Sequence, residues 1–260
     1  MQNRFKDKII IITGGAKGIG EACAVAFAQE GGMIAIADVD ENAGNIVVQK
    51  IKDTGSEAIF VKCDVSKSEQ VQRIVNKTIQ IFGGIDVLYN NAGVVRFGTV
   101  VELSEEDWDY QININLRASF LTCKYTIPEM IKRGGGAIVN TASAQAFASQ
   151  ETVAAYAASK GAIVSFTSSV ALDHAKDKIR CNCIAPGSIQ TPMLDDAAEL
   201  FGPEGNPSQA IKEWGDLHPL KRVGRADEVA KLVLFLASDD SSFCTGGCYR
   251  IEGGLLSALF

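Results

Sequence analysis

Short apolar runs alternate with longer segments of helical length along the whole chain, and this alternation limits the fold more than any other feature. Seven of the runs predict strands, at residues 8–13, 33–38, 57–62, 85–89, 136–141, 179–185 and 248–251. They are apolar at nearly every position, as parallel strands are when helices cover both faces. Helices are predicted between them, for example at residues 18–30, 67–82, 104–132 and 156–175. The sequence therefore predicts an α/β class, a doubly wound Rossmann fold with a seven-stranded parallel sheet and helices on both faces.

The chain has 260 residues and no internal repeat, low-complexity tract or linker, so we expect one domain over residues 1–260. One insertion, at residues 191–220, interrupts the alternation of strands and helices. It contains the run Gly-Pro-Glu-Gly-Asn-Pro at residues 202–207, which favours irregular backbone. We expect this insertion to form a lid over the substrate.

The charge balance argues against nucleic acid as a partner. Acidic residues outnumber basic ones by 31 to 25, and a net charge of -6 offers no basic surface to a polyanion. The apolar runs are far shorter than the ~20 residues that cross a bilayer, so we expect no membrane partner. The N-terminal segment lacks the apolar core of a secretory signal, which predicts a cytoplasmic protein.

Seven cysteines are scattered through apolar segments, and an odd number suits reduced core thiols better than a disulfide framework. The pairs Cys181/Cys183 and Cys244/Cys248 do not have the usual spacing of zinc ligands. Because the chain has only 2 histidines, we expect no metal site.

The first chemical signal is a glycine-rich turn between the first predicted strand and the first predicted helix. It reads Thr13-Gly14-Gly15-Ala16-Lys17-Gly18-Ile19-Gly20. Glycines let the backbone turn tightly and approach a diphosphate, and the N–H groups and dipole of the helix's first turn attract its charge. Such a turn can serve packing alone, but its place between strand and helix favours dinucleotide binding. The expected cofactor contacts here are Gly14, Lys17, Gly18, Ile19 and Gly20.

Asp38 ends the second predicted strand, about 20 residues after the glycine turn. A carboxylate there accepts hydrogen bonds from the adenosine ribose hydroxyls and repels a 2′-phosphate, which favours NAD over NADP. Lys17 is the opposing observation, because its ammonium could bind that phosphate. We give Asp38 the greater weight and expect NAD, with NADP as the less favoured cofactor.

Two further turns follow predicted strands, Cys63-Asp64-Val65 and Asn90-Asn91-Ala92-Gly93. The carboxyl ends of parallel strands form the edge at which open α/β sheets bind ligands. Either turn could be a plain connection. The cofactor contacts that we expect from them are Asp64, Val65, Asn91, Ala92 and Gly93.

The second chemical signal is Tyr156-x-x-x-Lys160 at the start of a predicted helix, after Ser143 has ended the preceding strand. Residues four apart lie on one helix face, so the Lys160 ammonium can approach the Tyr156 phenol. The usual pKa of tyrosine is about 10, and a nearby cation favours the phenolate. The pair is therefore a candidate acid/base, although an aromatic residue and a lysine at this spacing are also common on helix surfaces.

These motifs together resemble those of the short-chain dehydrogenase/reductase family, in its compact single-domain branch, and the resemblance covers nearly the whole chain. The matching positions are the glycine turn, Asp64, Asn90-Asn91-Ala92-Gly93, Asn115, Ser143, Tyr156-x-x-x-Lys160, and Pro186-Gly187 followed by Thr191. The segment at residues 243–254 also resembles the family's closing strand and interface segment.

The resemblance implies a role for each of these residues. Tyr156 would exchange a proton with the substrate oxygen that Ser143 binds, and hydride would pass to or from the nicotinamide. Lys160 would bind the nicotinamide ribose and lower the pKa of Tyr156, and Asn115 would hold a water of a proton relay. The remaining implied contacts are Asn90 and Gly93 at the adenosine, Asp64 at the adenine, Pro186 and Gly187 in the adjoining loop, and Ile189 and Thr191 at the carboxamide.

The family does not determine the substrate. Arg96, Gln145 and Gln150 come from three segments expected to border the cleft, and their hydrogen bonds suit hydroxyl or carboxylate groups. They favour a small polar alcohol such as a sugar, polyol or hydroxy acid, with Met193 also near it. An apolar wall would instead favour a hydroxysteroid or another apolar alcohol, and its candidate residues are Phe147, Met193, Leu194, Phe201 and Trp214.

Two other functions share this fold. A non-catalytic NAD-binding sensor or scaffold could dispense with Ser143, Tyr156 or Lys160, yet all three are present. An extended-branch sugar epimerase would carry a further substrate domain, for which the chain has little room. The resemblance also implies a homotetramer, with the helices at 104–132 and 156–175 forming one interface and the apolar tail at 255–260 a second.

Overall fold

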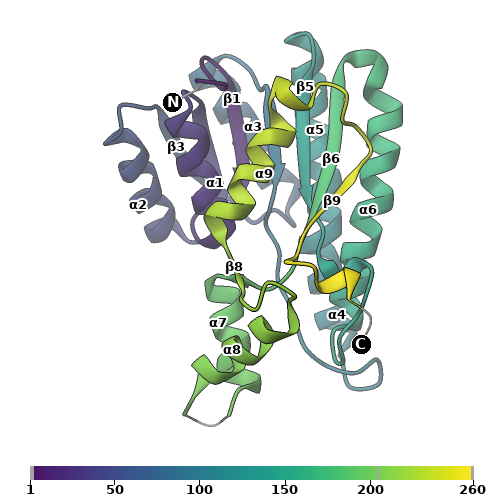
Figure 1. Ribbon diagram of the computed structural model, residues 1–260. Helices are drawn as coiled ribbons and strands as arrows, with labels where there is room; N and C mark the ends of the chain where they lie inside the picture. Colours follow the sequence, from purple (N-terminus) through teal and green to yellow (C-terminus); the bar gives the residue numbers. More distant parts are fainter. Residues whose placement is uncertain (1–2, 204, 259–260) are drawn as a thin grey trace.

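The computed structural model describes residues 3–203 and 205–258 (Figure 1). Seven strands form one parallel sheet, as the sequence predicts: β1 (Ile9–Thr13), β2 (Met33–Asp38), β3 (Ala58–Lys62), β4 (Val87–Asn90), β5 (Gly136–Thr141), β6 (Ile179–Pro186) and β9 (Cys248–Ile251). Their order across the sheet is β3-β2-β1-β4-β5-β6-β9. The order reverses direction between β1 and β4, the position at which doubly wound sheets open a ligand crevice.

Helices cover both faces of the sheet. On one face lie α1 (Gly18–Gln29), α2 (Glu41–Lys52) and α9 (Ala226–Ala237), and on the other α3 (Ser68–Phe82), α5 (Ala118–Lys132) and α6 (Ala154–His174). Strand β1 explains the two layers, because Ile10 and Ile12 join the core under α1 and α9, whereas Ile11 joins the core under α3 and α5. Each of these side chains is almost fully buried, which stabilises the fold by about 1.5–3 kcal/mol per residue.

The predicted helix at 104–132 is continuous but is not α-helical throughout. It consists of α4 (Glu105–Ile112), one π-helical turn at Asn113–Arg117, and α5. Such wider turns occur mostly as single insertions within α-helices, often at functional sites. The period of the apolar residues gave no sign of this one, since a single π turn leaves the pattern on both sides intact.

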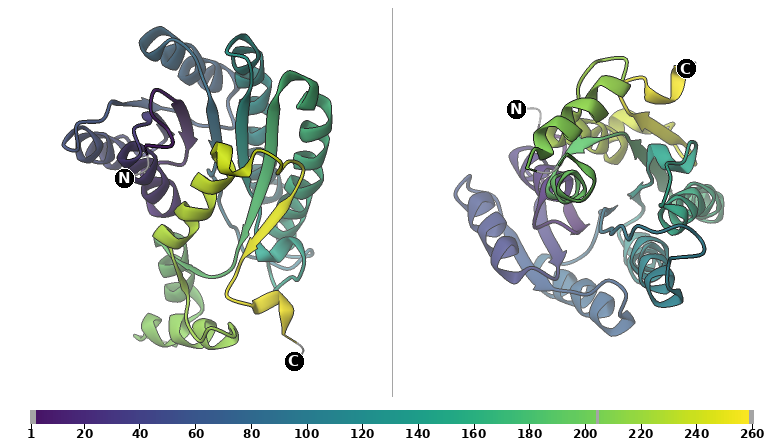
Figure 2. Two further views of the ribbon diagram at one scale, coloured as in Figure 1. Left: turned by 45° about the horizontal axis from the view of Figure 1, so that its top comes forward. Right: turned by 90° about the horizontal axis from the view of Figure 1, so that it is seen from below.

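The insertion at 191–220 is helical, so the expectation of an irregular segment was wrong. It forms α7 (Pro192–Phe201) and α8 (Pro207–Leu217), flanked by the short paired strands β7 (Ile189–Gln190) and β8 (Gly224–Arg225). Proline at each helix start needs no N–H donor and has a suitable φ, so these prolines begin helices. Figure 2, seen from below, shows α7 and α8 in the foreground at the carboxyl edge of the sheet.

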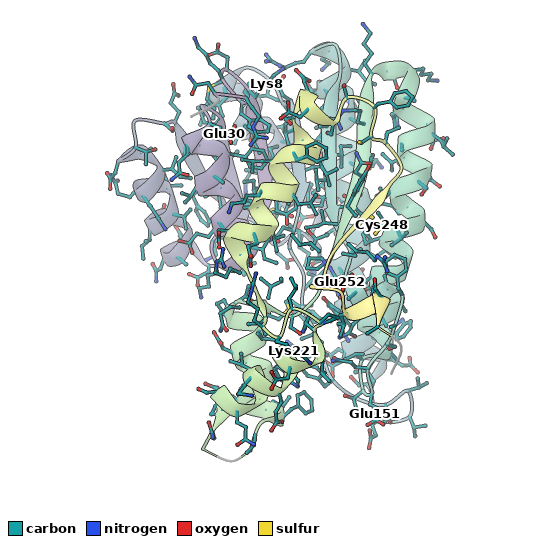
Figure 3. All side chains as sticks on the ribbon, viewed as in Figure 1. Lys8, Glu30, Glu151, Lys221, Cys248 and Glu252 are labelled. Carbon is teal, nitrogen blue, oxygen red and sulfur yellow. The ribbon has the colours of Figure 1, made fainter. Side chains whose placement is uncertain are left out.

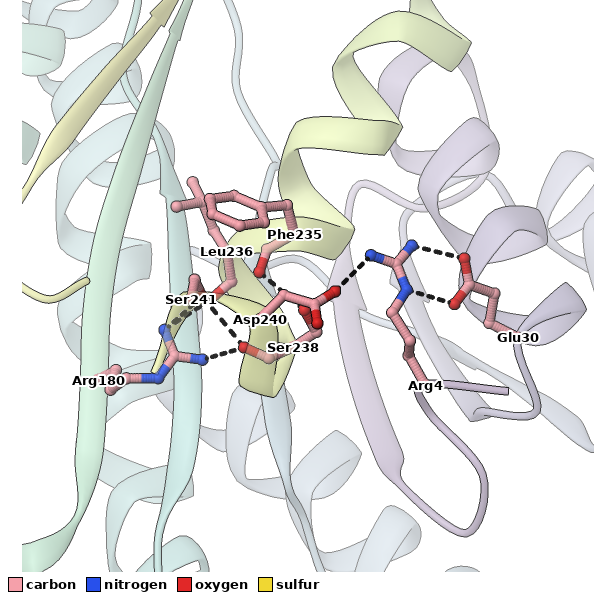
Figure 4. Close-up of polar contacts among 8 residues, drawn as sticks. All are labelled: Arg4, Glu30, Arg180, Phe235, Leu236, Ser238, Asp240 and Ser241. Carbon is pink, nitrogen blue, oxygen red and sulfur yellow. Dashed lines mark hydrogen bonds and ion pairs between the residues drawn. The ribbon is translucent and has the colours of Figure 1, made fainter. Parts of the chain in front are cut away.

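At the opposite, amino edge of the sheet, charged side chains link neighbouring elements by hydrogen bonds (Figure 4). The Arg180 guanidinium on β6 donates to the carbonyl oxygens of Leu236 and Ser238, each at 2.8 Å, and so satisfies the end of α9. Arg4 makes two hydrogen bonds of 2.6 Å to Glu30 just after α1. These bonds tie the amino edge together and leave the carboxyl edge open. Within residues 3–203 and 205–258, no helix is long and apolar enough to cross a membrane.

Candidate functional site

A cleft of about 710 Å³ lies at the carboxyl edge of the sheet. The strands β1, β2, β4, β5 and β6 all end at it, so motifs far apart in the sequence meet there. Most of the sequence-predicted site residues line it: Gly14, Lys17, Gly18, Ile19, Asp38, Asp64, Val65, Asn91, Ala92, Gly93, Ser143, Gln145, Gln150, Tyr156, Lys160, Pro186, Gly187, Ile189, Thr191 and Met193. Gly20, Asn115 and Arg96 do not.

The glycines of the turn after β1 let its backbone come very close to neighbouring groups. Gly14 and Gly18 have φ values of 64° and 58°, which side-chain-bearing residues rarely adopt. A Cβ on Gly14 would lie 2.9 Å from the Cα of Ala92, so only glycine fits where the ends of β1 and β4 meet. Gly20 serves the turn differently, because its missing Cβ makes room for the Gly14 carbonyl rather than for a ligand.

Asn91 supports this turn directly. Its amide nitrogen donates to the carbonyl oxygens of Gly14 (2.9 Å) and Thr13 (3.2 Å). The Thr13 hydroxyl in turn accepts from the backbone nitrogens of Asn91 (3.0 Å) and Ala92 (3.1 Å). Asn90, expected at the adenosine, is instead buried below the cleft and bonds to Asn140 and Thr122. Successive strand residues point to opposite faces, which is why only one of the two asparagines can reach the turn.

Tyr89 joins the glycine turn to the predicted catalytic lysine. Its hydroxyl donates to Asn91 Oδ1 (3.3 Å) and accepts from Thr141 Oγ1 (3.2 Å). The carbonyl of Thr141 accepts a 2.8 Å hydrogen bond from Lys160 Nζ. Burial raises the pKa of Tyr89 well above its usual value, so the hydroxyl keeps its proton and the chain of bonds persists. Sequence reasoning missed this residue, which resembles any other apolar strand position.

Asp38 is held in place by its own backbone neighbours. Its carboxylate accepts from the nitrogens of Ala16 and Asp40, both at 3.0 Å, and it lines the cleft beside the glycine turn. Lys17 also lines the cleft, but its ammonium pairs with Asp40 at 2.7 Å. A fixed carboxylate and a positive-φ glycine turn fit the ribose and diphosphate of a nicotinamide dinucleotide.

Asp64 and Val65 form the wall of the cleft beyond Asp38. The Asp64 carboxylate accepts from the nitrogen (2.9 Å) and hydroxyl (2.7 Å) of Ser66, which fixes the turn after β3. No group of three or more His, Cys, Asp or Glu side chains within the described residues is arranged to hold a metal ion.

Ser143, Tyr156 and Lys160 meet at the inner end of the cleft. Tyr156 lies in the first turn of α6, and Lys160 Nζ is 5.5 Å from the centre of its ring. Burial raises the pKa of Tyr156, and the nearby Ser143 hydroxyl opposes this only in part. Lys160 Nζ donates a 2.8 Å hydrogen bond to the Thr141 carbonyl, and the lowering of the Tyr156 pKa by Lys160 stays a prediction.

Lys160 is 3% exposed, and burial lowers its pKa to about 8. A buried ammonium without a carboxylate partner loses hydration that one hydrogen bond to a carbonyl does not replace. The proton on this lysine is therefore loosely held at physiological pH.

Asn115 lies on the π-helical turn and behind the cleft wall. Its amide accepts from the nitrogen of Val94 (2.8 Å) and donates to the Val94 carbonyl (2.9 Å) and to Ser159 Oγ (3.1 Å). A Cβ on Gly93 would lie 3.4 Å from both Asn115 Oδ1 and Lys160 Nζ, so a glycine separates the two. The amide itself positions the Val94 segment, and the water relay stays a prediction.

Comparisons with known proteins agree with this geometry. A family model described as enoyl-(acyl carrier protein) reductase matches residues 14–256. Dehydrogenase/reductase SDR family member 6 of Aquarana catesbeiana is 35% identical, over 96% of this chain and 98% of its own. The chain belongs to the short-chain dehydrogenase/reductase family. It is accordingly an oxidoreductase with a Rossmann fold, of a family that uses nicotinamide cofactors.

Two other similar members of the family have known substrates in their names. Cyclohexanol dehydrogenase of Acinetobacter sp. (strain SE19) is 35% identical, with 99% of this chain and 98% of that relative covered. L-sorbose reductase of Gluconobacter frateurii, solved with NADPH and L-sorbose, superposes with a TM-score of 0.95 at 32% identity, covering 100% of both chains.

The substrate end of this short-chain dehydrogenase/reductase has two neighbouring amides. Gln145 Nε2 donates to Gln150 Oε1 at 2.9 Å, and among the described residues Gln145 Oε1 is buried without a hydrogen-bond partner. Arg96, expected beside them, lies outside the cleft, where its guanidinium stacks 4.9 Å from the ring centre of Tyr110 and pairs with Asp107 at 3.6 Å. Of the three polar residues expected at the substrate, only Gln145 and Gln150 therefore line the cleft.

Many apolar side chains also line the expected substrate end: Val94, Val95, Phe97, Met193, Leu194, Trp214, Leu217, Leu255 and Leu256. Phe147 and Phe201 of the expected apolar wall lie outside it, and Phe201 packs against Phe97 with ring centres 4.6 Å apart. Leu255 and Leu256, which are part of the tail expected at a subunit interface, border the cleft. Residues 259–260 of that tail lie outside the described residues.

His218, which sequence reasoning did not select, connects the insertion at 191–220 to the loop after β6. Its Nδ1 donates to the Trp214 carbonyl (2.8 Å), and its Nε2 accepts from the Ser188 nitrogen (3.3 Å). The ring is 2% exposed and packs beside Gly187, where a Cβ would lie 2.8 Å from Nε2. The end of α8 and the loop after β6 are thus joined through one imidazole.

The lowered pKa of Lys160, about 8 against a usual 10.5, predicts a pH-dependent stability. Between these values the unfolded chain binds a proton that the folded protein has released, so the free energy of unfolding rises with pH by up to ~3 kcal/mol. Below pH 8 both states bind the proton, and above pH 10.5 neither does. Lys160→Met should remove this rise in urea unfolding of the cofactor-free protein. The exposed control Lys52→Met should keep it, and an identical slope in Lys160→Met would contradict the assignment.

Tyr89→Phe should weaken cofactor binding, because it removes the hydroxyl between Asn91 and Thr141 while it keeps the buried ring. Asn91 Oδ1 then loses its donor and the Thr141 hydroxyl loses its acceptor. We expect the NADH Kd to rise by roughly tenfold, or ~1.4 kcal/mol. Fluorescence titration with NADH measures this. Tyr125→Phe, which loses a 2.7 Å contact to Ser68 outside the cleft, is the matched control and should bind normally. Unchanged binding by Tyr89→Phe would show that the hydroxyl does not position the turn.

Proposed function

We propose that this protein is an NAD(H)-dependent oxidoreductase that interconverts a secondary alcohol and a ketone. One observation carries the proposal: Ser143, Tyr156 and Lys160 lie at one end of a single cleft whose other end holds the glycine turn and Asp38. A substrate carbon beside Tyr156 would be within the same enclosed space as a nicotinamide, which is the proximity that hydride transfer needs.

The protein's own residues would manage the proton. The Tyr156 phenol, protonated because burial raises its pKa, donates to the ketone oxygen during reduction and accepts the alcohol proton during oxidation. The Ser143 hydroxyl is placed by a 3.1 Å hydrogen bond from the Gln145 nitrogen and is free to donate to the same oxygen. A bound nicotinamide supplies or accepts the hydride. Lys160, with a pKa of about 8, is a second group in the cleft that can take up or release a proton near neutral pH.

NAD is the proposed cofactor because of the charges at the adenosine end. The Asp38 carboxylate is fixed by two backbone N–H groups, and Lys17 is engaged by Asp40. A 2′-phosphate would therefore meet a fixed negative charge and no free cation. L-sorbose reductase was solved with NADPH, so the proposal of NAD for this chain rests on the Asp38 charge and not on that similarity.

The proposed substrate is a small secondary alcohol with at least one further polar group, such as a sugar, polyol or hydroxy acid. Gln145 and Gln150 offer hydrogen bonds, and a substrate hydroxyl that reached Gln145 Oε1 would relieve an unpaired buried oxygen. The apolar walls favour a second candidate, a compact ring alcohol. The two named relatives act on cyclohexanol and L-sorbose, one of each kind.

The assay for this proposal follows NADH formation with a panel of sugars, polyols, hydroxy acids, ring alcohols and hydroxysteroids. Tyr156→Phe should keep NADH binding and lose at least ~100-fold in turnover, the usual contribution of a positioned acid/base. Tyr110→Phe, which removes another hydroxyl from the cleft lining, should remain active. Undiminished turnover by Tyr156→Phe would refute its proton role, and tight NADH binding without turnover of any alcohol would favour a non-catalytic sensor.

Asp38→Asn tests the cofactor. It keeps the shape of the side chain and removes the charge, so the NADP-to-NAD ratio of kcat/KM should rise by about tenfold or more, equivalent to at least ~1.4 kcal/mol. Asp64→Asn removes a carboxylate from the same cleft, away from the expected ribose, and should leave the ratio unchanged. A ratio that stays constant in Asp38→Asn would mean that this charge does not select NAD.

We also propose that the chain works in the cytoplasm as a homotetramer. Seven free cysteines suit a reducing compartment. The exposed apolar side chains of Phe120 on α5 and Leu172 on α6, which are 48% and 81% exposed, lie on the two helices assigned to the interface. The apolar tail at 255–260 is the proposed second interface, and Leu255 and Leu256 within it also border the cleft.

A further inference from the structure

Two cysteines face each other across neighbouring strands near the edge of the sheet. Cys183 on β6 is the direct register partner of Cys248 on β9. Backbone hydrogen bonds fix this register on both sides, from Cys183 to the Gly247 carbonyl (2.9 Å) and from Gly187 to the Ile251 carbonyl (3.0 Å). The two thiols therefore cannot slide apart without breaking the end of the sheet.

Their side chains share one face and one environment. Cys183 belongs to a small buried cluster with Ala142 and Ile163, and Cys248 packs against that cluster. Paired residues of adjacent strands have backbones about 4.7–4.9 Å apart, within the ~4.4–6.8 Å between Cα atoms that a disulfide spans. The pair can thus be bridged with little backbone movement.

Only one member of the pair is accessible. Cys183 is fully buried, whereas Cys248 is partly exposed on β9, which Figure 3 shows along the front of the sheet. Cys248 also lines a second cavity of about 440 Å³, together with Phe147, Ala148 and Leu256. A small reagent can enter beside Cys248 and reach Cys183 only through it.

The charges favour Cys248 as the attacking group. The adjacent Cys183 thiol and then the Arg250 guanidinium lower the pKa of Cys248, although burial opposes them. The pKa of Cys183 is raised, first by the neighbouring Cys248 sulfur and then by burial. The pKa values of Cys23, Cys123 and Cys181 are also raised, chiefly by burial. Because the thiolate is the nucleophile, Cys248 should react before these thiols.

We propose that Cys183 and Cys248 form a dithiol site that undergoes thiol–disulfide exchange with small-molecule disulfides. The Cys248 thiolate attacks one sulfur of the reagent, which breaks its S–S bond and releases one thiolate. The Cys183 sulfur then attacks the Cys248 sulfur, giving up its proton to the released thiolate, and expels the second half of the reagent as a thiolate that takes a proton from water. Two protein thiols are oxidised to one disulfide, and the reagent is reduced to two thiols.

The site has a structural path to the substrate end of the cleft. Leu255 and Leu256 line both the cavity beside Cys248 and the main cleft. Oxidation that tightens β9 against β6 should shift these leucines and raise the substrate KM several-fold, reversibly with a reducing agent. This consequence rests on the proposed function, whereas the exchange itself does not.

The test exposes the full chain to glutathione disulfide, followed by alkylation and mass spectrometry. We expect a protein that takes up two fewer alkyl groups than the reduced control, with the Cys183 and Cys248 peptides joined in a non-reducing digest. Cys183→Ser should stop at a stable glutathione adduct on Cys248, and Cys248→Ser should react at least about tenfold more slowly. Cys244→Ser is the matched control and should behave as the parent protein.

Two results would overturn the site. One is a digest of the unsubstituted protein that joins other cysteines or places glutathione mainly on Cys244, a readout that does not depend on any variant folding. The other is a Cys248→Ser protein that reacts as fast as the parent. A protein that forms the Cys183–Cys248 bond but keeps its substrate KM would overturn only the coupling to the cleft.

Discussion

The contact between the ends of β1 and β4 is the constraint on which the site depends. Gly14 approaches Ala92 so closely that no side chain fits, and Asn91 and Thr13 close the approach with four hydrogen bonds. The glycine turn on one side and Gly93, beside Lys160, on the other are both positioned from this contact. A buried parallel sheet supplies the rigidity, since Ile10, Ile11 and Ile12 pack into cores on both faces.

Much of the fold could be predicted from the sequence because parallel strands buried on both faces leave an unambiguous pattern. All seven strands lie within two residues of the expected ranges, since each is a continuous apolar run bounded by turn residues. The prediction of irregular backbone at 191–220 was wrong for a physical reason. Pro207, the last residue of the run at 202–207, was taken as a sign of irregular chain, yet it begins α8, because proline at a helix start is favourable.

The site residues also include some that the sequence could predict and some that it could not. Residues whose chemistry depends on backbone placement, such as Asp38 and Lys160, could be predicted because strand ends and helix spacing determine where they lie. Residues whose role depends on the direction of the side chain could not be predicted from the sequence. Arg96 turns outward to Tyr110, Asn90 turns down into the core, and Tyr89 carries a buried hydroxyl at a position that looks purely apolar.

Burial shapes the proton chemistry of the ligand-free site more than charge pairing does. It raises the pKa of Tyr156 and lowers that of Lys160, so both groups are driven toward their neutral forms. A neutral phenol is the form that donates a proton to a ketone, whereas alcohol oxidation first requires the phenolate. In the proposed reaction the Tyr156 proton would therefore be in place for reduction, and oxidation of an alcohol would become easier as pH rises and the phenol loses that proton.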